Sequence, residues 1–185
     1  MALKKIGYEN LTGIDVSEEM LNQCRLADTS LNLILTDIAT EESSCYLNSF
    51  DLITSFRFFT NADHNLKLKV LPKLQQFLKP NGILIVNFHQ NSSSILGRIY
   101  LLRNFILQKK IANVTSERDT ILLFKQYGFE LVETRYYSIF PRFGNLFNNF
   151  EFLLNFFMIS SERIYDFFGL PRKYKQAYIH VFRKL

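Results

Sequence analysis

Short apolar runs alternate along this chain with stretches in which apolar residues recur every three or four positions. Ser17, followed by Glu18 and Glu19, predicts the start of one helix, and the apolar positions from Leu66 to Leu78 predict a longer helix that the turn residues 80–82 end. Runs with the length and apolar content of buried strands occupy residues 11–16, 31–37, 50–56 and 83–88. Strands that alternate with helices indicate βαβ units and a largely parallel sheet.

The second half of the chain has a different pattern. Residues 92–113 form a looser region, and Ser116 then predicts the N-cap of a helix that ends at Gly128. Residues 129–137 and 177–184 alternate between apolar and polar positions, which favours strands at a sheet edge. Between these two strands lies an aromatic-rich, helical segment at about 142–170. Without repeats or a low-complexity linker, residues 1–185 are expected to form a single domain.

Composition excludes several classes of protein. The 22 Lys and Arg against 17 Asp and Glu are scattered, which favours solvated surface charges over a nucleic-acid interface. Cys24 and Cys45 have no metal-binding or disulfide spacing, and the three histidines are far apart, so no metal site is expected. No apolar stretch has the length of a signal peptide or a membrane span. We therefore expect a soluble, cytoplasmic protein.

Two acids mark the candidate chemistry. Asp15 and Asp37 each end a predicted buried strand, and the ends of neighbouring parallel strands line one ligand-binding crevice. An acid at this position accepts hydrogen bonds from ribose hydroxyls in dinucleotide-binding sheets. A loop aspartate that helps to cap the following helix is an equally good interpretation of Asp15.

The order of these motifs resembles that of class I S-adenosylmethionine-dependent methyltransferases, over nearly the whole chain. Residues 8–21 resemble the second strand and following helix of that family, 50–55 its fourth strand, 78–87 its fifth, 127–129 the start of its sixth, and 178–184 its antiparallel seventh. The resemblance implies an α/β, doubly wound, Rossmann-like sheet that is mostly parallel with an antiparallel last strand. It also implies S-adenosylmethionine as cofactor and a small-molecule methyl acceptor.

Carried over position by position, the resemblance implies a role for each of several residues. Asp15 would hold the ribose hydroxyls and Asp37 the adenine amino group. The other cofactor contacts would be Val16, Met20 and Ile38 around the adenosine, and Ser55, Phe56 and Arg57 beside the methionine part. Met20 and Ile38 are equally well explained as core residues.

A general base helps methyl transfer when the acceptor is a hydroxyl. His89 is the best-placed candidate because it follows the fifth family strand, and His64 is a weaker one. The alternative for His89 is a surface or loop histidine without a catalytic role.

The family's first strand and its glycine-rich loop have no counterpart here. Counting back about 20 residues from Asp15 passes Met1, and none of the seven glycines cluster. We expect an N-terminally truncated methyltransferase with weakened cofactor binding. Loss of a central strand should leave unpaired strand edges or force the neighbouring strands together.

Three alternatives remain at this point. The chain could be a non-catalytic remnant that acts as a binding or interaction module. It could be a nicotinamide-dependent dehydrogenase, although the last strand and residues 79–82 favour a methyltransferase. The aromatic-rich segment could be a core helix, which we favour, a lid over an apolar acceptor, or a membrane-surface contact, which its low positive charge disfavours.

Overall fold

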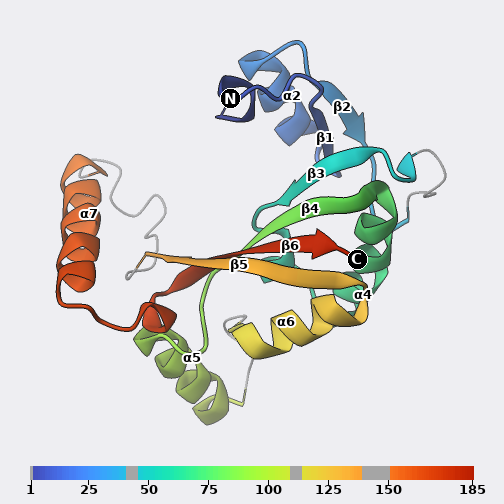
Figure 1. The fold of residues 1–185 in the computed structure, drawn as a ribbon. Coiled ribbons are helices and arrows are strands. Elements are labelled where there is room, and N and C mark those ends of the chain that lie inside the picture. Colours follow the sequence, from blue (N-terminus) through green and yellow to red (C-terminus); the bar gives the residue numbers. More distant parts are fainter. Residues whose placement is uncertain (1, 41–45, 109–113, 139–150) are drawn as a thin grey trace. The chain divides into compact units, whose positions relative to one another are not determined.

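The structure is a computed structural model that describes residues 2–40, 46–108, 114–138 and 151–185 (Figure 1). At residues 2 and 151–158 it describes the backbone but not the side chains. Contacts divide the chain into two compact units, Met1–Cys45 and Tyr46–Leu185. The expectation of a single domain stays a prediction. Cys45 and the 142–150 part of the aromatic-rich segment lie outside the described residues.

The first unit is a small βαβ motif. It contains helix α1 (Ala2–Lys5), strand β1 (Thr12–Asp15), helix α2 (Glu18–Ala27) and strand β2 (Asn32–Leu35). β1 and β2 pair in parallel, with Asp15 opposite Leu35. Ser17 caps α2 as predicted, since its hydroxyl accepts a hydrogen bond from the Met20 N–H at 3.3 Å.

The second unit is built on a four-stranded sheet in the order β3-β4-β6-β5. The strands are β3 (Phe50–Ser55), β4 (Leu78–Phe88), β5 (Phe129–Tyr137) and β6 (Ala177–Lys184). The helices are α3 (Phe58–Asn61), α4 (His64–Phe77), α5 (Ile95–Ile106), α6 (Glu117–Gln126) and α7 (Glu151–Phe167), with a 3₁₀ turn at Arg172–Tyr174. β3 and β4 are parallel, whereas β6 runs antiparallel to both β4 and β5. The predicted antiparallel last strand is confirmed.

The position of β6 corrects one expectation. Its alternating pattern indicates an edge strand, but β6 lies inside the sheet and β5 is the edge. Two polar residues of β6, His180 and Lys184, are buried rather than solvated. Each has a partner from another part of the unit: Thr134 lies 3.0 Å from His180 Nδ1, and the Leu78 carbonyl accepts from Lys184 Nζ at 2.7 Å. These partners let polar residues occupy an internal strand.

Strand β4 also begins earlier than the sequence suggests. α4 ends at Phe77, and β4 begins at the next residue, so the predicted turn at 80–82 lies within the strand as an irregularity. Leu78 pairs with Phe50, and the ladder resumes only where Ile83 pairs with Leu52. Pro80 has no N–H to donate and Asn81 has a positive φ of 63°, so these residues cannot continue the ladder.

Aromatic side chains make up much of the core of the second unit. Seven of them are at most 1% exposed: Phe59, Phe77, Phe88, Phe124, Phe129, Tyr178 and Phe182. The rings of Phe124 on α6 and Phe182 on β6 stack at 4.4 Å between centroids. Six of the 19 phenylalanines of the chain therefore lie in this core.

Two helical regions differ from the expectations drawn from the sequence. The region predicted to be loose contains α5, which Ser94 caps by accepting from the Gly97 N–H at 2.9 Å. At the end of α7, Phe167 and Phe168 are 85% and 70% exposed, so a core-helix interpretation does not hold for this end of the aromatic-rich segment. Within the described residues, no helix is both long and apolar enough to cross a membrane.

Each sheet ends in two edge strands with no further strand partner among the described residues: β1 and β2 in one sheet, and β3 and β5 in the other. β1 pairs only with β2, and β3 pairs only with β4. Exposed N–H and C=O groups along such edges are available to pair with another strand.

Candidate functional site

The two acids singled out in the sequence lie at the same end of the two-stranded sheet. Asp15 ends β1 and Asp37 follows β2, and the Thr36 N–H donates to the Asp15 carbonyl at 3.1 Å. Parallel pairing therefore brings both carboxylates to the carboxyl end of one sheet, where ligands bind in folds of this type.

Each acid also supports its own loop. Asp15 Oδ1 accepts from the Ser17 N–H, and Asp37 Oδ1 accepts from the Ala39 N–H, both at 2.8 Å. The capping interpretation of Asp15 is thus correct for one carboxylate oxygen. The Oδ2 atom of each acid makes no hydrogen bond within the described part of the chain and can accept from a ligand.

The apolar residues expected around the adenosine are open to solvent to different degrees. Val16 is 68% exposed and Met20 is 49% exposed, so neither is a core residue. Ile38 is half-buried, which fits both core packing and ligand contact. Val16 and Met20 therefore leave apolar surface open to solvent.

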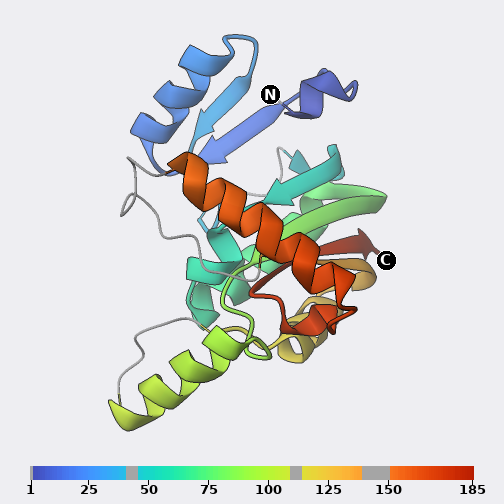
Figure 2. The same ribbon diagram turned by 90° about the vertical axis from the view of Figure 1, so that its left-hand side faces the viewer.

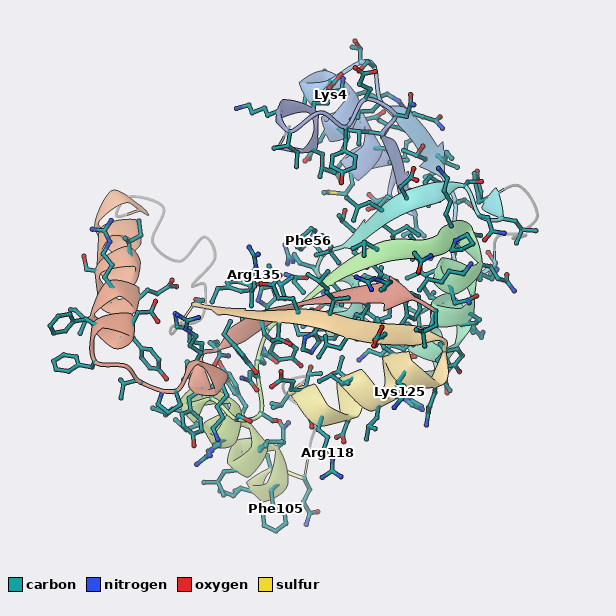
Figure 3. The ribbon with its side chains drawn as sticks, viewed as in Figure 1. Lys4, Phe56, Phe105, Arg118, Lys125 and Arg135 are labelled. Atoms are coloured by element: carbon teal, nitrogen blue, oxygen red, sulfur yellow. The ribbon has the colours of Figure 1, made fainter. Side chains whose placement is uncertain are left out.

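The other expected cofactor residues lie in the second unit, at the carboxyl end of β3. Ser55 is the last residue of the strand, and Phe56 follows with 54% of its surface exposed (Figure 3). Arg57 has the left-handed backbone angle φ of 67° and precedes α3. Its N–H donates to Asn87 Oδ1 at 2.6 Å, which joins the ends of β3 and β4.

Asn87 is the functional candidate that sequence reasoning missed. It is buried near the end of β4, and its side-chain Nδ2 lies 3.1 Å from His89 Nε2 and 3.3 Å from the Tyr137 hydroxyl. These contacts connect the carboxyl ends of β3, β4 and β5. The only signal in the sequence is one amide residue in an otherwise apolar run at 83–88.

The hydrogen bonds of Asn87 determine how His89 is held. A backbone N–H can only donate, so the Arg57 contact identifies Oδ1 as the acceptor and Nδ2 as the donor. Neutral His89 then accepts at Nε2 and carries its proton on Nδ1, a tautomer assigned from the hydrogen-bond pattern. The His89 ring lies edge-on to Tyr137, with centroids 6.2 Å apart. His64, in contrast, is the exposed first residue of α4 and belongs to no such cluster.

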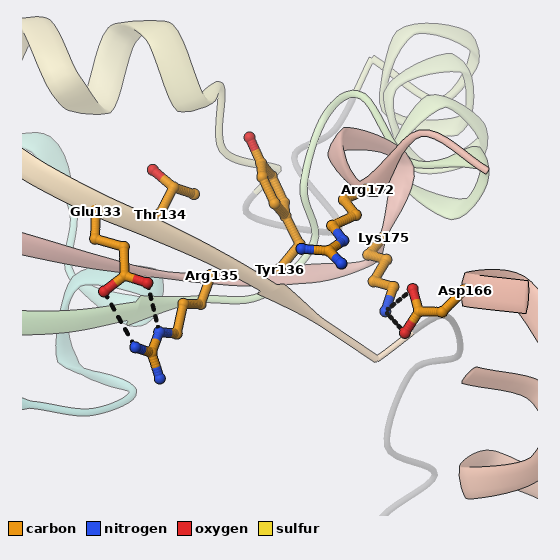
Figure 4. A pocket seen from close by; sticks show the side chains of 7 residues that line it. All are labelled: Glu133, Thr134, Arg135, Tyr136, Asp166, Arg172 and Lys175. Atoms are coloured by element: carbon orange, nitrogen blue, oxygen red, sulfur yellow. Dashed lines mark hydrogen bonds and ion pairs between the residues drawn. The ribbon is translucent and has the colours of Figure 1, made fainter. Parts of the chain in front are cut away.

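A polar cavity of about 300 Å³ lies near the end of β5 (Figure 4). Its lining residues are Glu133, Thr134, Arg135, Tyr136, Asp166, Arg172 and Lys175. Figure 4 shows two ion pairs in the lining. In one, Arg135 Nε lies 2.7 Å from Glu133 Oε1, and in the other, Lys175 Nζ lies 3.0 Å from Asp166 Oδ1.

Neighbouring groups shift the pKa values of two side chains in this cavity. The hydrogen bond from Arg135 lowers the pKa of the Glu133 carboxyl, which keeps that group ionised. Burial, followed by the hydrogen bond to Glu117, raises the pKa of the Tyr136 hydroxyl, which therefore stays protonated. Three cations and two acids in the lining favour a polar occupant over an apolar one.

Comparison with known proteins identifies the family. A family model described as a methyltransferase domain matches residues 2–134, well over half of the chain. The chain belongs to this methyltransferase domain family. Among curated proteins, none matches the sequence.

Solved structures of methyltransferases share the fold of this methyltransferase domain. A SAM-dependent methyltransferase from Methanosarcina mazei is 19% identical, with a TM-score of 0.69 over 100% of this chain and 85% of that one. A SAM-dependent methyltransferase from Archaeoglobus fulgidus is 16% identical, with a TM-score of 0.61 over 99% and 79%. The N-methyltransferase NodS from Bradyrhizobium japonicum, solved with S-adenosyl-L-homocysteine, is 14% identical, with a TM-score of 0.56 over 95% and 66%. The predicted Rossmann-like fold class is confirmed.

Proposed function

We propose that this methyltransferase domain transfers a methyl group from S-adenosylmethionine to a small polar acceptor. The observation that carries the proposal is the position of Asp15 and Asp37 at one end of a parallel strand pair. In each acid, Oδ1 accepts from a loop N–H, and Oδ2 makes no hydrogen bond within the described residues. Family membership and the printed names of the structural relatives support the choice of cofactor.

The donor set fits this cofactor. Two carboxylate oxygens can accept from ribose hydroxyls and from an adenine amino group, and Val16, Met20 and Ile38 offer apolar contacts to the ring. Ser55, Phe56 and Arg57 are the residues proposed to contact the methionine part. When bound, the cofactor supplies an electrophilic methyl group on a sulfonium.

The proposed role of the Asn87 cluster is to position the acceptor. A methyl transfer is a displacement in line with the leaving group, so orientation of the nucleophile supplies much of the acceleration. Asn87 holds the His89 ring at Nε2, and we place this ring beside the acceptor. A general-base role for His89 stays a prediction, and it requires the Asn87 bond to Nε2 to open.

The polar cavity beside β5 favours a polar acceptor. Arg172 and the ion pair of Lys175 with Asp166 offer charges to a carboxylate, phosphate or hydroxyl-bearing group.

Isothermal titration of S-adenosylmethionine into the chain tests the cofactor assignment. Asp15→Asn and Asp37→Asn keep the Oδ1 acceptor for the loop N–H groups but remove the charge that would hold the cofactor. We expect each to weaken binding by roughly tenfold or more, because a hydrogen bond to a charged group contributes about 1.5–3 kcal/mol.

Asp51→Asn is the matched control, since Asp51 is an exposed acid on β3 paired with Lys79 at 2.8 Å. It should leave cofactor binding unchanged. If the wild-type chain shows no heat of binding while remaining folded by circular dichroism, the alternative of a non-catalytic interaction module takes the place of this proposal. If Asp15→Asn, Asp37→Asn and Asp51→Asn all bind the cofactor as tightly as the wild-type chain, the two acids have no part in the site.

A further inference from the structure

Helix α5 has an exposed apolar stripe that neither the fold nor the proposed methyl transfer uses. The helix extends away from the four-stranded sheet, and Phe105 points outward near its far end (Figures 2 and 3). In α5 only Gly97 is buried. The stripe consists of Ile95, Ile99, Leu102 and Ile106, which are 76%, 52%, 59% and 66% exposed, and beside it Phe105 is 80% exposed.

The spacing of these residues aligns them. Steps of four, three and four residues place Ile95, Ile99, Leu102 and Ile106 on one line of the helix surface. Arg98 and Arg103 fall on either side of that line, about 60° to 80° from its centre at 100° per residue. Long cationic side chains at the borders of an apolar stripe can place their charges in the headgroup layer while the stripe is buried.

The segment of the sequence that contains α5 carries charge of one sign. No Asp or Glu occurs from residue 64 to residue 116, and this stretch contains eight Lys and Arg. Although charges are scattered over the whole chain, residues 64–116 form a long segment in which every charged residue is cationic, and α5 lies near its end. The two charged residues of α5 itself, Arg98 and Arg103, are both cationic, which complements an anionic surface and opposes contact between two copies of α5.

We propose that α5 binds peripherally to an anionic lipid surface, with the stripe in the interface and Arg98 and Arg103 at the headgroups. A twelve-residue helix is about 18 Å long, too short to cross a bilayer core of about 30 Å but suited to lie in its plane. The aromatic-rich segment, considered in the sequence as a membrane contact, lacks this cationic border. The proposal does not depend on methyl transfer.

Flotation with vesicles tests the proposal on the full chain. Phosphatidylcholine vesicles with and without about one third phosphatidylserine are mixed with the protein at low and high salt. We expect the wild-type protein to float with the anionic vesicles at low salt and to be released by high salt, because the attraction is partly electrostatic. Neutral vesicles should bind it weakly.

Three variants separate the contributions. Phe105→Gln removes an exposed apolar group and should weaken partitioning roughly tenfold or more. The double change Arg98→Gln and Arg103→Gln should weaken it by about fivefold per arginine on anionic vesicles only. Leu122→Gln is the matched control, because Leu122 is 49% exposed on α6, outside the stripe, and should float like the wild type.

Three results would overturn the proposal. The wild-type chain could stay in solution with every vesicle, or Leu122→Gln could lose as much binding as Phe105→Gln. Alternatively, light scattering could show an oligomer that Phe105→Gln dissociates and that vesicles do not disrupt, which would make the stripe a protein interface. Circular dichroism of each variant verifies that loss of flotation is not loss of folding.

Discussion

At the scale of single residues, His180 is the most unusual ionisable group. It is completely buried on β6 among aromatic rings, with the Tyr178 ring at 4.6 Å and the Phe182 ring at 5.4 Å. Its Nδ1 lies 3.0 Å from the Thr134 hydroxyl. Burial lowers the pKa of the imidazole from 6.5 to about 4, because the charged form would lose its hydration.

This shift predicts a pH dependence of folding. The folded state binds the His180 proton less tightly than the unfolded chain does, so stability is complete above pH 6.5 and falls as the pH drops towards 4. The loss attributable to His180 should reach about 3 kcal/mol near pH 4. Urea unfolding between pH 4 and pH 7.5 measures it.

His180→Leu should flatten the part of the pH profile that lies between 4 and 6.5, whatever its effect on absolute stability. His64→Gln, which changes an exposed histidine, should keep the wild-type slope. Identical slopes for His180→Leu and the wild type would contradict a depressed pKa at His180.

At the scale of elements, the irregular start of β4 depends on a lysine from another strand. Lys184 on β6 is 9% exposed, and its Nζ donates to the Leu78 carbonyl at 2.7 Å and to Asn48 Oδ1 at 3.0 Å. Leu78 is the last paired residue before the interruption at 79–82. The lysine therefore stabilises the point at which α4 passes into the sheet.

Replacement of this lysine should be costly. Lys184→Met keeps a similar length but leaves the Leu78 carbonyl without its charged donor, and we expect a loss of about 1–3 kcal/mol in the free energy of unfolding. Urea denaturation of the purified variant measures this loss.

Lys79→Met is the control from the same region. Lys79 forms an exposed ion pair with Asp51, and such pairs contribute about 0–1 kcal/mol. Equal losses in the free energy of unfolding for the two variants would show that the buried contact of Lys184 stabilises the fold no more than the exposed ion pair does.

At the scale of the whole molecule, the two units differ in how much core they contain. In the Met1–Cys45 unit, Leu21 is the one apolar side chain that is buried among the described residues. All the other apolar side chains that the structure describes as buried belong to Tyr46–Leu185. A unit with so few buried contacts should open at a lower free energy.

Hydrogen exchange can test this difference. We expect the amides of β1 and β2 to exchange faster than those of β4 and β6, which lie inside the four-stranded sheet. Mass spectrometry of peptides that cover 12–35 and 83–88 gives the comparison. Equal protection in both units would mean that they open together, and so would contradict the prediction.

The sequence by itself determined most of the strands, the capped helices and the two acids, and their order was enough to identify the family. These features depend on neighbours along the chain: apolar periodicity, a cap residue such as Ser17, and an acid at the end of a strand. The same local information placed Asp15 and Asp37 at the same sheet end, because parallel strands align their carboxyl ends.

Only the tertiary structure decided the internal position of β6, the Asn87 cluster and the exposure of α5. The first two depend on partners distant in the sequence: Thr134 for His180, and Arg57 and Tyr137 for Asn87. A polar residue in a strand has the same local pattern whether it meets water or a buried partner. An apolar stripe likewise has the same period whether another element covers it or leaves it exposed, and only the packing of the whole chain distinguishes the two.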